Sequence, residues 1–544
     1  MGNCNISAVL QAVAADRGAE IGLVEKKGAG YRRYTFSELD FHRRDFAARL
    51  QGAGIGPGDR VMLMVRPSME FIALTFALFS IGAVVILIDP GMGYRNLLRC
   101  IQSVKPDILV SVPRGVLLSR LFPRPFVNVR KRICVGRSLG LLGDSLAALK
   151  PALDRKDFEA ATDDLAAVIF TTGSTGPPKG VQYTHGIFHA QLSLIKEYYG
   201  IGPGEVDQPA FPLFALFSTA LGARAVLPDM DPSRPAQVDP ARFIRTLVDE
   251  QVTYSFGSPA IWNVVSRYCL EREIKLPVRK VLMAGAPVSG ELVRRVGNII
   301  ADDGEIHTPY GATESLPITS ITGREIIDNC RPLTRKGKGV CVGRPLPGIT
   351  IHIIKPSDGP ISDWQQVNRL DPGEIGEIVV KGAVVTRAYD HNPGETQMAK
   401  ISDGETFRHR MGDMGYFDSA GRLWFCGRKA HVVHTAKGPL YSVCCEGIFN
   451  THPQVVRSAL VGIGRPGRQA PVLLVEKKEG VGESNLLAEL ETLAKEHELT
   501  RNISTFLVHR GFPVDIRHNA KIFREKLALW AERRLRGKHC DDGL

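Results

Sequence analysis

A short apolar segment, residues 167–170, is followed directly by a run rich in glycine, serine and threonine that contains a lysine near its end. The run reads Thr171, Thr172, Gly173, Ser174, Thr175, Gly176, Pro177, Pro178, Lys179 and Gly180. Glycines let the backbone approach an anion closely, while hydroxyl groups and a lysine ammonium add donors and positive charge. The spacing fits neither a Walker A loop nor a dinucleotide-binding fingerprint. A flexible linker is the alternative, but a linker would not follow a buried strand and end in Pro-Pro-Lys-Gly. We therefore predict a phosphate-binding loop of another type.

Other short segments with glycine, hydroxyl or charged residues follow the loop along the chain. They are Gly285-Ala286-Pro287, Tyr310-Gly311-Ala312-Thr313-Glu314, Gly412-Asp413, Arg428 and Lys521. Together with the loop they resemble the motifs of the acyl-adenylate-forming superfamily, which includes acyl-CoA synthetases, luciferases and the adenylation domains of peptide synthetases. The motifs keep that family's order across almost the whole chain. The resemblance implies an ATP-dependent, AMP-forming enzyme that activates a carboxylic acid as its acyl-adenylate.

The resemblance also implies a role for each motif, with ATP and Mg²⁺ as cofactors. Nucleotide binding falls to Thr171, Thr172, Gly173, Ser174, Thr175, Gly176, Lys179, Gly285, Ala286, Pro287, Tyr310, Gly311, Asp413 and Arg428. Within this set Tyr310 lies near adenine, Asp413 accepts from the ribose hydroxyls, and Arg428 contacts ribose and phosphate. The catalytic residues are Thr313, which donates to the α-phosphate, Glu314, which holds Mg²⁺, and Lys521, which bridges the carboxylate and the α-phosphate. Such groups suit the reaction, because the attack of a carboxylate on a phosphate brings anions together and needs a hard cation and donors.

Three positions depart from the pattern of acyl-CoA synthetases. Ala215 stands where histidine is usual, Ala430 stands where aspartate or lysine is usual, and Pro439 stiffens the loop after the hinge. In acyl-CoA synthetases this loop shapes the path of the pantetheine arm. The three changes therefore weaken the expectation of thioester formation without touching adenylation.

These departures are similar to those of one branch of the family, the olefin β-lactone synthetases of bacterial long-chain olefin biosynthesis. The matching stretches are 211–217, 228–237, 256–260, 308–314, 426–430 and 438–441. Ser218 differs, because an acidic residue is expected there. The branch implies activation of a long-chain 2-alkyl-3-hydroxy fatty acid, whose own 3-hydroxyl displaces AMP to give a β-lactone. It also implies a substrate pocket at Phe214, Ala215 and Gly257, and other enzymes of the olefin pathway as partners.

Other functions stay open at this point. They are a long-chain fatty acid–CoA ligase that uses the same acyl-adenylate, a carrier-protein loading module, and a non-catalytic binding protein. The intact motifs argue against the last of these. The 3-hydroxyl needs a proton acceptor, and His185 and His189 follow the phosphate loop. A lone histidine there is more often structural, so neither is assigned.

Elements that could hold these motifs are visible in the hydrophobic pattern. Short β-branched runs alternate with longer helix-like segments at 60–65, 84–88, 108–112, 167–170 and 280–283. This alternation predicts an α/β architecture with largely parallel sheets. A last strand at 423–426 precedes a unit with its own strands (458–463, 471–476) and helix (486–498). We therefore expect the acyl-adenylate-forming enzyme fold, with a large N-terminal domain of packed sheets and helices (1–428) and a small mobile α+β lid (429–544).

Composition limits the class of partner and the compartment. Lys and Arg outnumber Asp and Glu by 69 to 57, which favours anionic ligands. The densest basic stretch, between residues 114 and 137, is most simply a solvated face, with peripheral contact to anionic lipid as the alternative. No helix-turn-helix, zinc-finger or RNA-binding signature accompanies the charge, so nucleic acid is not expected as a partner. Ten scattered cysteines without a C-x-x-C pair, and no secretory signal, predict a cytoplasmic protein with reduced thiols. The apolar run 72–88 is split by Gly82, which predicts a buried helix and strand rather than a membrane span.

Overall fold

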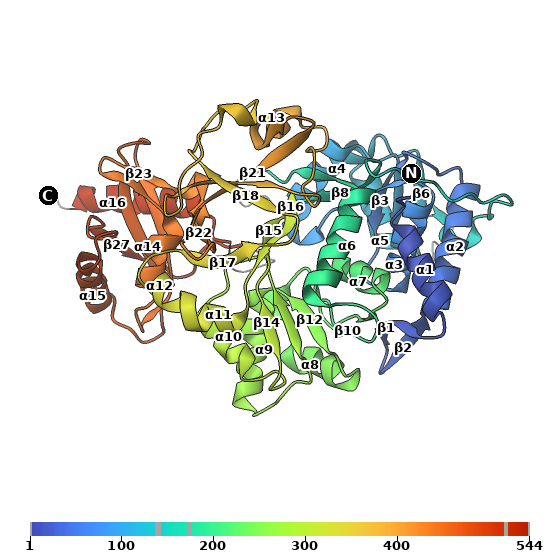
Figure 1. Ribbon diagram of the computed structural model, residues 1–544, viewed down its shortest axis with the longest axis horizontal. Helices are drawn as coiled ribbons and strands as arrows, with labels where there is room; N and C mark the ends of the chain where they lie inside the picture. Colours follow the sequence, from blue (N-terminus) through green and yellow to red (C-terminus); the bar gives the residue numbers. More distant parts are fainter. Residues whose placement is uncertain (1–2, 137–142, 172–176, 516–520, 542–544) are drawn as a thin grey trace.

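The computed structural model describes residues 3–136, 143–171, 177–515 and 521–541. Two seven-stranded sheets with helices around them, an eight-stranded sheet and a smaller C-terminal part make up the described chain. Figure 1 shows the C-terminal part, in orange and red, at one end of the long axis of the molecule. Among the described residues no helix combines the length and the apolar character that crossing a bilayer requires.

The first seven-stranded sheet has the order β7-β6-β5-β3-β4-β8-β9 and is parallel except where β9 runs against β8. Its strands are β3 (Arg60–Met64), β4 (Val84–Leu87), β5 (Ile108–Ser111), β6 (Lys131–Cys134), β7 (Asp144–Ser145), β8 (Leu165–Phe170) and β9 (Gly180–Thr184). In β3, Val61 and Leu63 enter one core and Met62 enters the core on the opposite face. Because both faces of β3, β4, β5 and β8 are largely buried, these four strands are nearly continuous apolar runs, which is the pattern that the sequence shows.

The second seven-stranded sheet has the order β14-β13-β12-β10-β11-β1-β2 and is parallel except between β1 and β2. Its strands are β1 (Ile21–Lys27), β2 (Gly30–Thr35), β10 (Val206–Asp207), β11 (Arg224–Val226), β12 (Tyr254–Gly257), β13 (Lys280–Met283) and β14 (Glu305–His307). Its outer face packs on α8 (Pro240–Asp249), α9 (Pro259–Glu271) and α10 (Gly290–Gly297). Asp239 fixes the start of α8, because its side chain accepts from the backbone of Arg242 while Pro240 occupies the first turn.

A layer of helices fills the space between these two sheets (Figure 1). It contains α1 (Ser7–Arg17), α2 (Phe36–Gly52), α3 (Met69–Ser80), α6 (His185–Tyr199) and α7 (Pro212–Ala220). Ile72 of α3 and Ile187 of α6 share one core with Val85 of β4 and Ala225 of β11. Helix α3 is buried on every side and ends before Gly82, whose φ of +74° lets the chain turn into β4. The predicted buried helix and strand at 72–88 are thus confirmed. The far face of the first sheet is covered by α4 (Tyr94–Val104) and α5 (Pro113–Leu121).

The third sheet differs from the expected parallel arrangement, since every pair in it is antiparallel. Its strands are β15 (Tyr310–Ala312), β16 (Ser315–Ser320), β17 (Val340–Pro345), β18 (Thr350–Ile354), β19 (Gly376–Lys381), β20 (Lys400–Asp403), β21 (Thr406–Phe417) and β22 (Leu423–Arg428). Local patterning marks a strand but does not reveal the direction of its partner, which explains the difference. The short helices nearby are α11 (Gly323–Glu325), η5 (Ile326–Cys330), α12 (Arg331–Arg335), η6 (Trp364–Gln366) and α13 (Pro393–Ala399).

The C-terminal part begins after β22 with the turn η7 (Lys429–His431). Its other elements are β23 (Val433–Thr435), β24 (Gly438–Leu440), α14 (Ser442–Phe449), β25 (Val455–Ile463), β26 (Ala470–Lys477), α15 (Glu483–Glu496), β27 (Thr505–Val508) and α16 (Arg524–Asp541). Strand β26 alternates between two cores, with Leu473 facing α15 and Leu474 facing α16. The predicted α/β class is confirmed, whereas the division at 428/429 and the mobility of the lid stay predictions.

Candidate functional site

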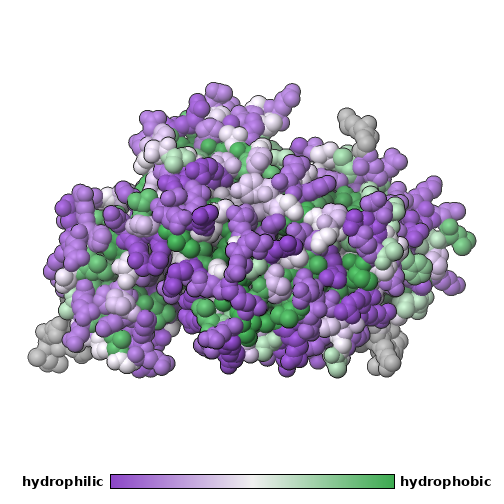
Figure 2. Space-filling view, turned by 60° about the horizontal axis from the view of Figure 1, so that its bottom comes forward, coloured by the Kyte–Doolittle hydropathy of each residue, from purple (hydrophilic) through white to green (hydrophobic). Residues whose placement is uncertain are grey.

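An open cleft of about 2850 Å³ lies between the three sheets and the C-terminal part. Met64 and Leu87, at the carboxyl ends of β3 and β4, border it on one side, and Gly257 of β12 borders it on the other. Ligands of α/β sheets bind at this edge of the strands. The cleft exceeds the roughly 300–1,000 Å³ of a pocket for one small ligand, so it has room for a nucleotide and a long acyl chain. Figure 2 shows hydrophobic residues in the middle of an otherwise mostly hydrophilic face.

A buried carboxylate is held at the cleft by two groups from different strands. Asp413 of β21 pairs in register with Arg428 of β22, and Arg428 Nη1 lies 3.0 Å from Asp413 Oδ1. The hydroxyl of Tyr310, from β15, donates to Asp413 Oδ2 at 2.6 Å. Burial raises the pKa of Asp413, and the Arg428 guanidinium and the Tyr310 hydroxyl act in the opposite direction. Asp413, Tyr310 and Arg428, which belong to three motifs predicted to bind the nucleotide, therefore contact one another in the structure.

Glu314 is fixed by residues that no motif indicated. Its Oε1 accepts from the hydroxyl of Tyr389 at 2.7 Å. Its backbone carbonyl accepts from both the backbone N–H and the hydroxyl of Thr386, at 2.9 and 3.0 Å. The ammonium of Lys400 in turn donates to the carbonyl of Thr386. Burial lowers the pKa of Lys400 to about 7, although the nearby charge of Glu314 acts to raise it.

Hydrogen bonds join Thr171 and Lys179, which lie at the two described ends of the phosphate loop. The backbone N–H of Lys179 donates to Thr171 Oγ1 at 3.1 Å, and the backbone N–H of Thr171 donates to the Lys179 carbonyl at 3.0 Å. The Lys179 ammonium forms an ion pair with Glu395 of α13 and lies 5.1 Å from the centre of the Tyr389 ring. The rest of the predicted loop, Thr172, Gly173, Ser174, Thr175 and Gly176, lies outside the described residues.

Two glycine-bearing motifs have a structural reason for their glycine. Gly285 follows β13 with a φ of +96°, a conformation that other residues rarely adopt, and it lines the cleft with Ala286 and Pro287. At Gly311 a Cβ would lie 2.5 Å from the carbonyl oxygen of Ser315, so no larger residue fits. Thr313 and Glu314 follow in the turn between β15 and β16 and also line the cleft.

Lys521 reaches the same cleft from the C-terminal part. Its backbone N–H donates to the Asp515 carboxylate at 3.1 Å. Its positive charge acts on Asp413 and favours a lower pKa of that carboxyl. Three residues further on, Arg524 forms an ion pair with the buried Glu446, with Nη2 at 2.6 Å from the carboxylate, and this contact holds the segment in place. Lys521 thus lies close enough to the Asp413 carboxylate for their charges to interact.

The apolar side of the cleft contains two of the three residues predicted for the substrate pocket. Phe214 stacks on Phe256 with ring centroids 3.7 Å apart, and both rings line the cleft. Gly257 also lines it, and a Cβ there would come within 2.8 Å of Trp262 Nε1. Ala215 differs from the expectation, because it has no exposed surface and packs into the core between the sheets. On α7 the neighbours of Ala215, not Ala215 itself, face the cleft.

A buried polar cluster, which the sequence did not reveal, lies beside this apolar wall. The Ser218 hydroxyl donates to the Asp207 carboxylate, and the Tyr254 hydroxyl donates to Ser218 Oγ at 3.0 Å. All three side chains are buried. Burial raises the pKa of Asp207 to about 8. Position 218 thus carries a serine where an acidic residue was expected, but the carboxyl group of Asp207, from β10, lies directly beside it.

His185 and His189 hold the N-terminal segment against α6. Nδ1 of His185 accepts from the backbone N–H of Ile6 at 3.1 Å, and Nε2 of His189 lies 3.1 Å from the carbonyl oxygen of Cys4. Burial lowers the pKa of His185 to about 4. Both rings thus have structural partners, as a lone histidine usually does.

The donors at the cleft suit Mg²⁺ bound through a substrate. Mg²⁺ is commonly held by one or two carboxylates together with substrate phosphates, and it keeps several waters. Over the described parts of the chain no group of three or more His, Cys, Asp and Glu side chains could hold a metal by itself. Glu314 supplies one carboxylate, and its partner Tyr389 contacts the phosphate-loop lysine. A carboxylate in this position fits a metal that arrives with a polyphosphate.

Comparison with known proteins gives a consistent result. The family model described as AMP-binding enzyme matches residues 10–390. An olefin β-lactone synthetase from Stenotrophomonas maltophilia is 44% identical over 550 residues, covering 98% of this chain and 99% of that protein. A long-chain-fatty-acid–CoA ligase from Thermus thermophilus is 24% identical and covers 82% of this chain and 81% of that protein. The solved structure of an amide bond synthetase from Marinactinospora thermotolerans has a TM-score of 0.79 at 23% identity, covering 96% of this chain and 99% of that one. The expected adenylate-forming fold is thereby confirmed.

Proposed function

This chain belongs to the AMP-binding enzyme family, and we propose that it converts a long-chain 2-alkyl-3-hydroxy fatty acid into a β-lactone through an acyl-adenylate. The observation that carries the first half of the proposal is the meeting of Asp413, Arg428, Tyr310 and Lys521 in one cleft. Support for the second half comes from the 44% identity to an olefin β-lactone synthetase along nearly the whole chain.

In the first step a carboxylate oxygen of the fatty acid attacks the α-phosphorus of ATP, and diphosphate leaves. Asp413 accepts from the ribose hydroxyls in this proposal, and the Arg428 guanidinium beside it binds ribose and phosphate. Lys179 exchanges its ion pair with Glu395 for the phosphates. Thr313 and Lys521 donate to the α-phosphate oxygens, which gain charge in the transition state. Glu314, held by Tyr389, provides the oxygen for Mg²⁺, which neutralises phosphate charge when bound.

In the second step the 3-hydroxyl oxygen of the same acyl chain attacks the carbonyl carbon of the adenylate. The bond from that carbon to the AMP phosphate oxygen breaks, AMP leaves, and the hydroxyl proton is lost. An internal nucleophile needs no second binding site and reacts at a high effective concentration once it is oriented. The apolar wall formed by Phe214 and Phe256 provides the surface on which the chain would be oriented.

The competing function is formation of a CoA thioester from the same adenylate. Ala430 and Pro439 line the cleft where an acyl-CoA synthetase needs a path for pantetheine. The fatty acid–CoA ligase from Thermus thermophilus is also much less similar to this chain, at 24% identity. Both facts favour the lactone over the thioester. Residues 429–544 act in this scheme as a lid that brings Lys521 to the site, and the protein works in the cytoplasm beside other enzymes of the olefin pathway.

The test is to incubate the pure protein with ATP, Mg²⁺ and a 3-hydroxy fatty acid, with and without CoA, and to measure AMP and the mass of the product. We expect AMP release without CoA, no stimulation by CoA, and a product lighter than the acid by one water. An unsubstituted fatty acid is the control and should be adenylated at most, because it has no internal nucleophile. Efficient conversion of that control into a CoA thioester would overturn the lactone proposal and leave adenylation intact.

A further inference from the structure

Exposed apolar side chains gather on one short part of the surface. Of the large hydrophobic residues exposed in the described chain, Leu117, Leu121, Phe122 and Val127 fall between residues 117 and 127. Their exposed fractions are 46%, 66%, 48% and 80%. Single exposed apolar residues are normal on a protein surface, but a cluster of them marks an interaction site. We call these four side chains, together with the exposed Arg114, Arg120 and Arg124, the α5 patch.

The geometry of α5 explains why these side chains point outward. Gly115, Val116 and Ser119 are buried on one side of the helix. Arg114, Leu117 and Leu121 are exposed and follow the spacing i, i+3 and i+7, which places them on the opposite side. The chain then continues with Phe122 into the turn η2 (Arg124–Phe126). The exposed side of α5 and the residues that follow it therefore carry both apolar side chains and arginines.

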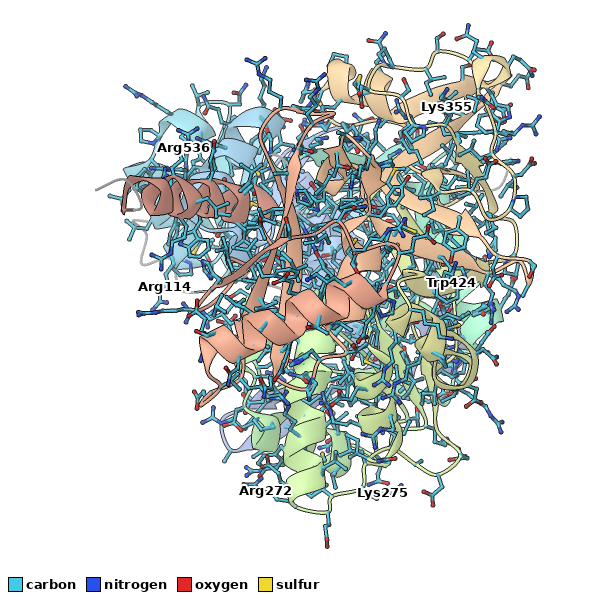
Figure 3. All side chains as sticks on the ribbon, turned by 90° about the vertical axis from the view of Figure 1, so that its left-hand side faces the viewer. Arg114, Arg272, Lys275, Lys355, Trp424 and Arg536 are labelled. Atoms are coloured by element: carbon cyan, nitrogen blue, oxygen red, sulfur yellow. The ribbon has the colours of Figure 1, made fainter. Side chains whose placement is uncertain are left out.

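The charge of this segment has one sign. Residues 113–136 contain Arg114, Arg120, Arg124, Arg130, Lys131 and Arg132 and neither Asp nor Glu. Arg130 pairs with Asp59, and Arg132 donates to Ser119. In contrast, Arg114, Arg120 and Arg124 are exposed, and no carboxylate of the described chain lies within 4 Å of them. Figure 3 shows Arg114 projecting outward on the same side of the molecule as Arg536 and away from Lys355 and Trp424.

The α5 patch starts next to the cleft. Helix α5 follows β5, which is parallel to β3, so the carboxyl ends of both strands meet at one edge of the sheet. The backbone N–H of Val112, just before α5, donates to the carbonyl of Met64, and Met64 lines the cleft. A surface that contacts the α5 patch would therefore lie beside the edge at which ligands enter.

We propose that the α5 patch docks on the surface of an anionic phospholipid bilayer. Leu117, Leu121 and Phe122 enter the boundary between headgroups and acyl chains, and the unpaired arginines bind lipid phosphates. A short amphipathic element with basic and apolar side chains binds anionic membranes through this combination. Docking of this kind would hold the cleft near a bilayer in which a long-chain acid dissolves. Only this benefit depends on the proposed function, because the binding itself needs neither ATP nor a fatty acid.

The experiment is co-sedimentation of the full-length protein with vesicles of phosphatidylcholine mixed with phosphatidylglycerol, and with phosphatidylcholine alone. We expect binding only to the anionic vesicles, weakening as salt rises. The variant Arg114→Gln/Arg120→Gln/Arg124→Gln should lower the partition coefficient on the order of a hundredfold, since each basic residue near an anionic surface contributes about fivefold. Leu121→Ser/Phe122→Ser should also weaken binding while keeping its salt dependence.

The matched control is Arg242→Gln/Arg272→Gln/Arg324→Gln, which removes the same charge from exposed arginines elsewhere on the chain. It should bind vesicles like the unchanged protein. Equal weakening in the control and the α5 variant would overturn the proposal in favour of diffuse attraction by the net positive charge. Absence of vesicle binding would overturn it in favour of a protein partner on this surface. Diphosphate exchange with a short soluble acid reports in the same preparations whether the fold and the adenylation site are intact.

Discussion

Replacing His185 with glutamine tests how burial of this ring couples the stability of the protein to pH. The imidazole is 1% exposed, and its Nδ1 accepts a hydrogen bond from the backbone N–H of Ile6. A proton on Nδ1 would place two donors against each other in a buried site. Glutamine has an oxygen that can accept the same hydrogen bond, but it does not titrate. The variant therefore removes the protonation and keeps the contact.

The magnitude follows from the pKa. Burial lowers the pKa of His185 from 6.5 to about 4, which at 1.36 kcal/mol for each pH unit amounts to about 3 kcal/mol. Between these two values the unfolded chain binds the proton and the folded chain does not. The free energy of unfolding therefore carries this contribution in full above pH 6.5 and loses it as the pH falls towards 4.

The assay is urea denaturation of the wild-type protein and of His185→Gln at a series of pH values from 4 to 8, followed by circular dichroism. We expect the wild-type protein to lose about 3 kcal/mol more than the variant between pH 6.5 and 4. The difference between the two proteins cancels the titration of all other groups. If the two pH curves are parallel within about 1 kcal/mol, the link between burial of His185 and acid stability is refuted.

Three further outcomes follow from the site. Lys521→Ala should slow adenylation by about 30- to 1,000-fold, the loss expected for one transition-state donor, with little change in ATP binding; normal diphosphate exchange would show that another lysine acts. Glu314→Gln should respond to added Mg²⁺ and Asp413→Asn should not, and a magnesium titration in which the two respond alike contradicts the metal assignment. Asp207, whose pKa of about 8 exceeds that of an unfolded aspartate, stabilises the protein at low pH and loses that contribution as the pH rises from about 4 to 8. Asp207→Asn should flatten this part of the stability curve, and unchanged alkaline sensitivity would count against a buried neutral carboxyl.

The sequence by itself determined the features that are local in the chain. The central strands of the two largely parallel sheets, such as β3, β4, β5, β8 and β13, are mostly buried, so each one is a short apolar run that can be recognised without knowing its neighbours. The motifs around Tyr310, Asp413 and Arg428 are also local, because in each of them a few consecutive residues provide both the backbone conformation and the functional side chain. The family and the AMP-forming chemistry therefore followed from the sequence.

Tertiary structure decided what depends on contacts between distant segments. Tyr389, which donates to Glu314, and Lys400, which donates to the carbonyl of Thr386 beside it, lie far along the chain from Glu314, and only the tertiary fold brings them there. Ser218 of α7 donates to Asp207 of β10, and no sequence pattern linked Asp207 to that position. The side of α7 that faces the cleft, which excludes Ala215, depends on how the helix is rotated between two sheets. Sequence spacing fixes the order of residues along a helix, but the packing of its neighbours fixes its orientation.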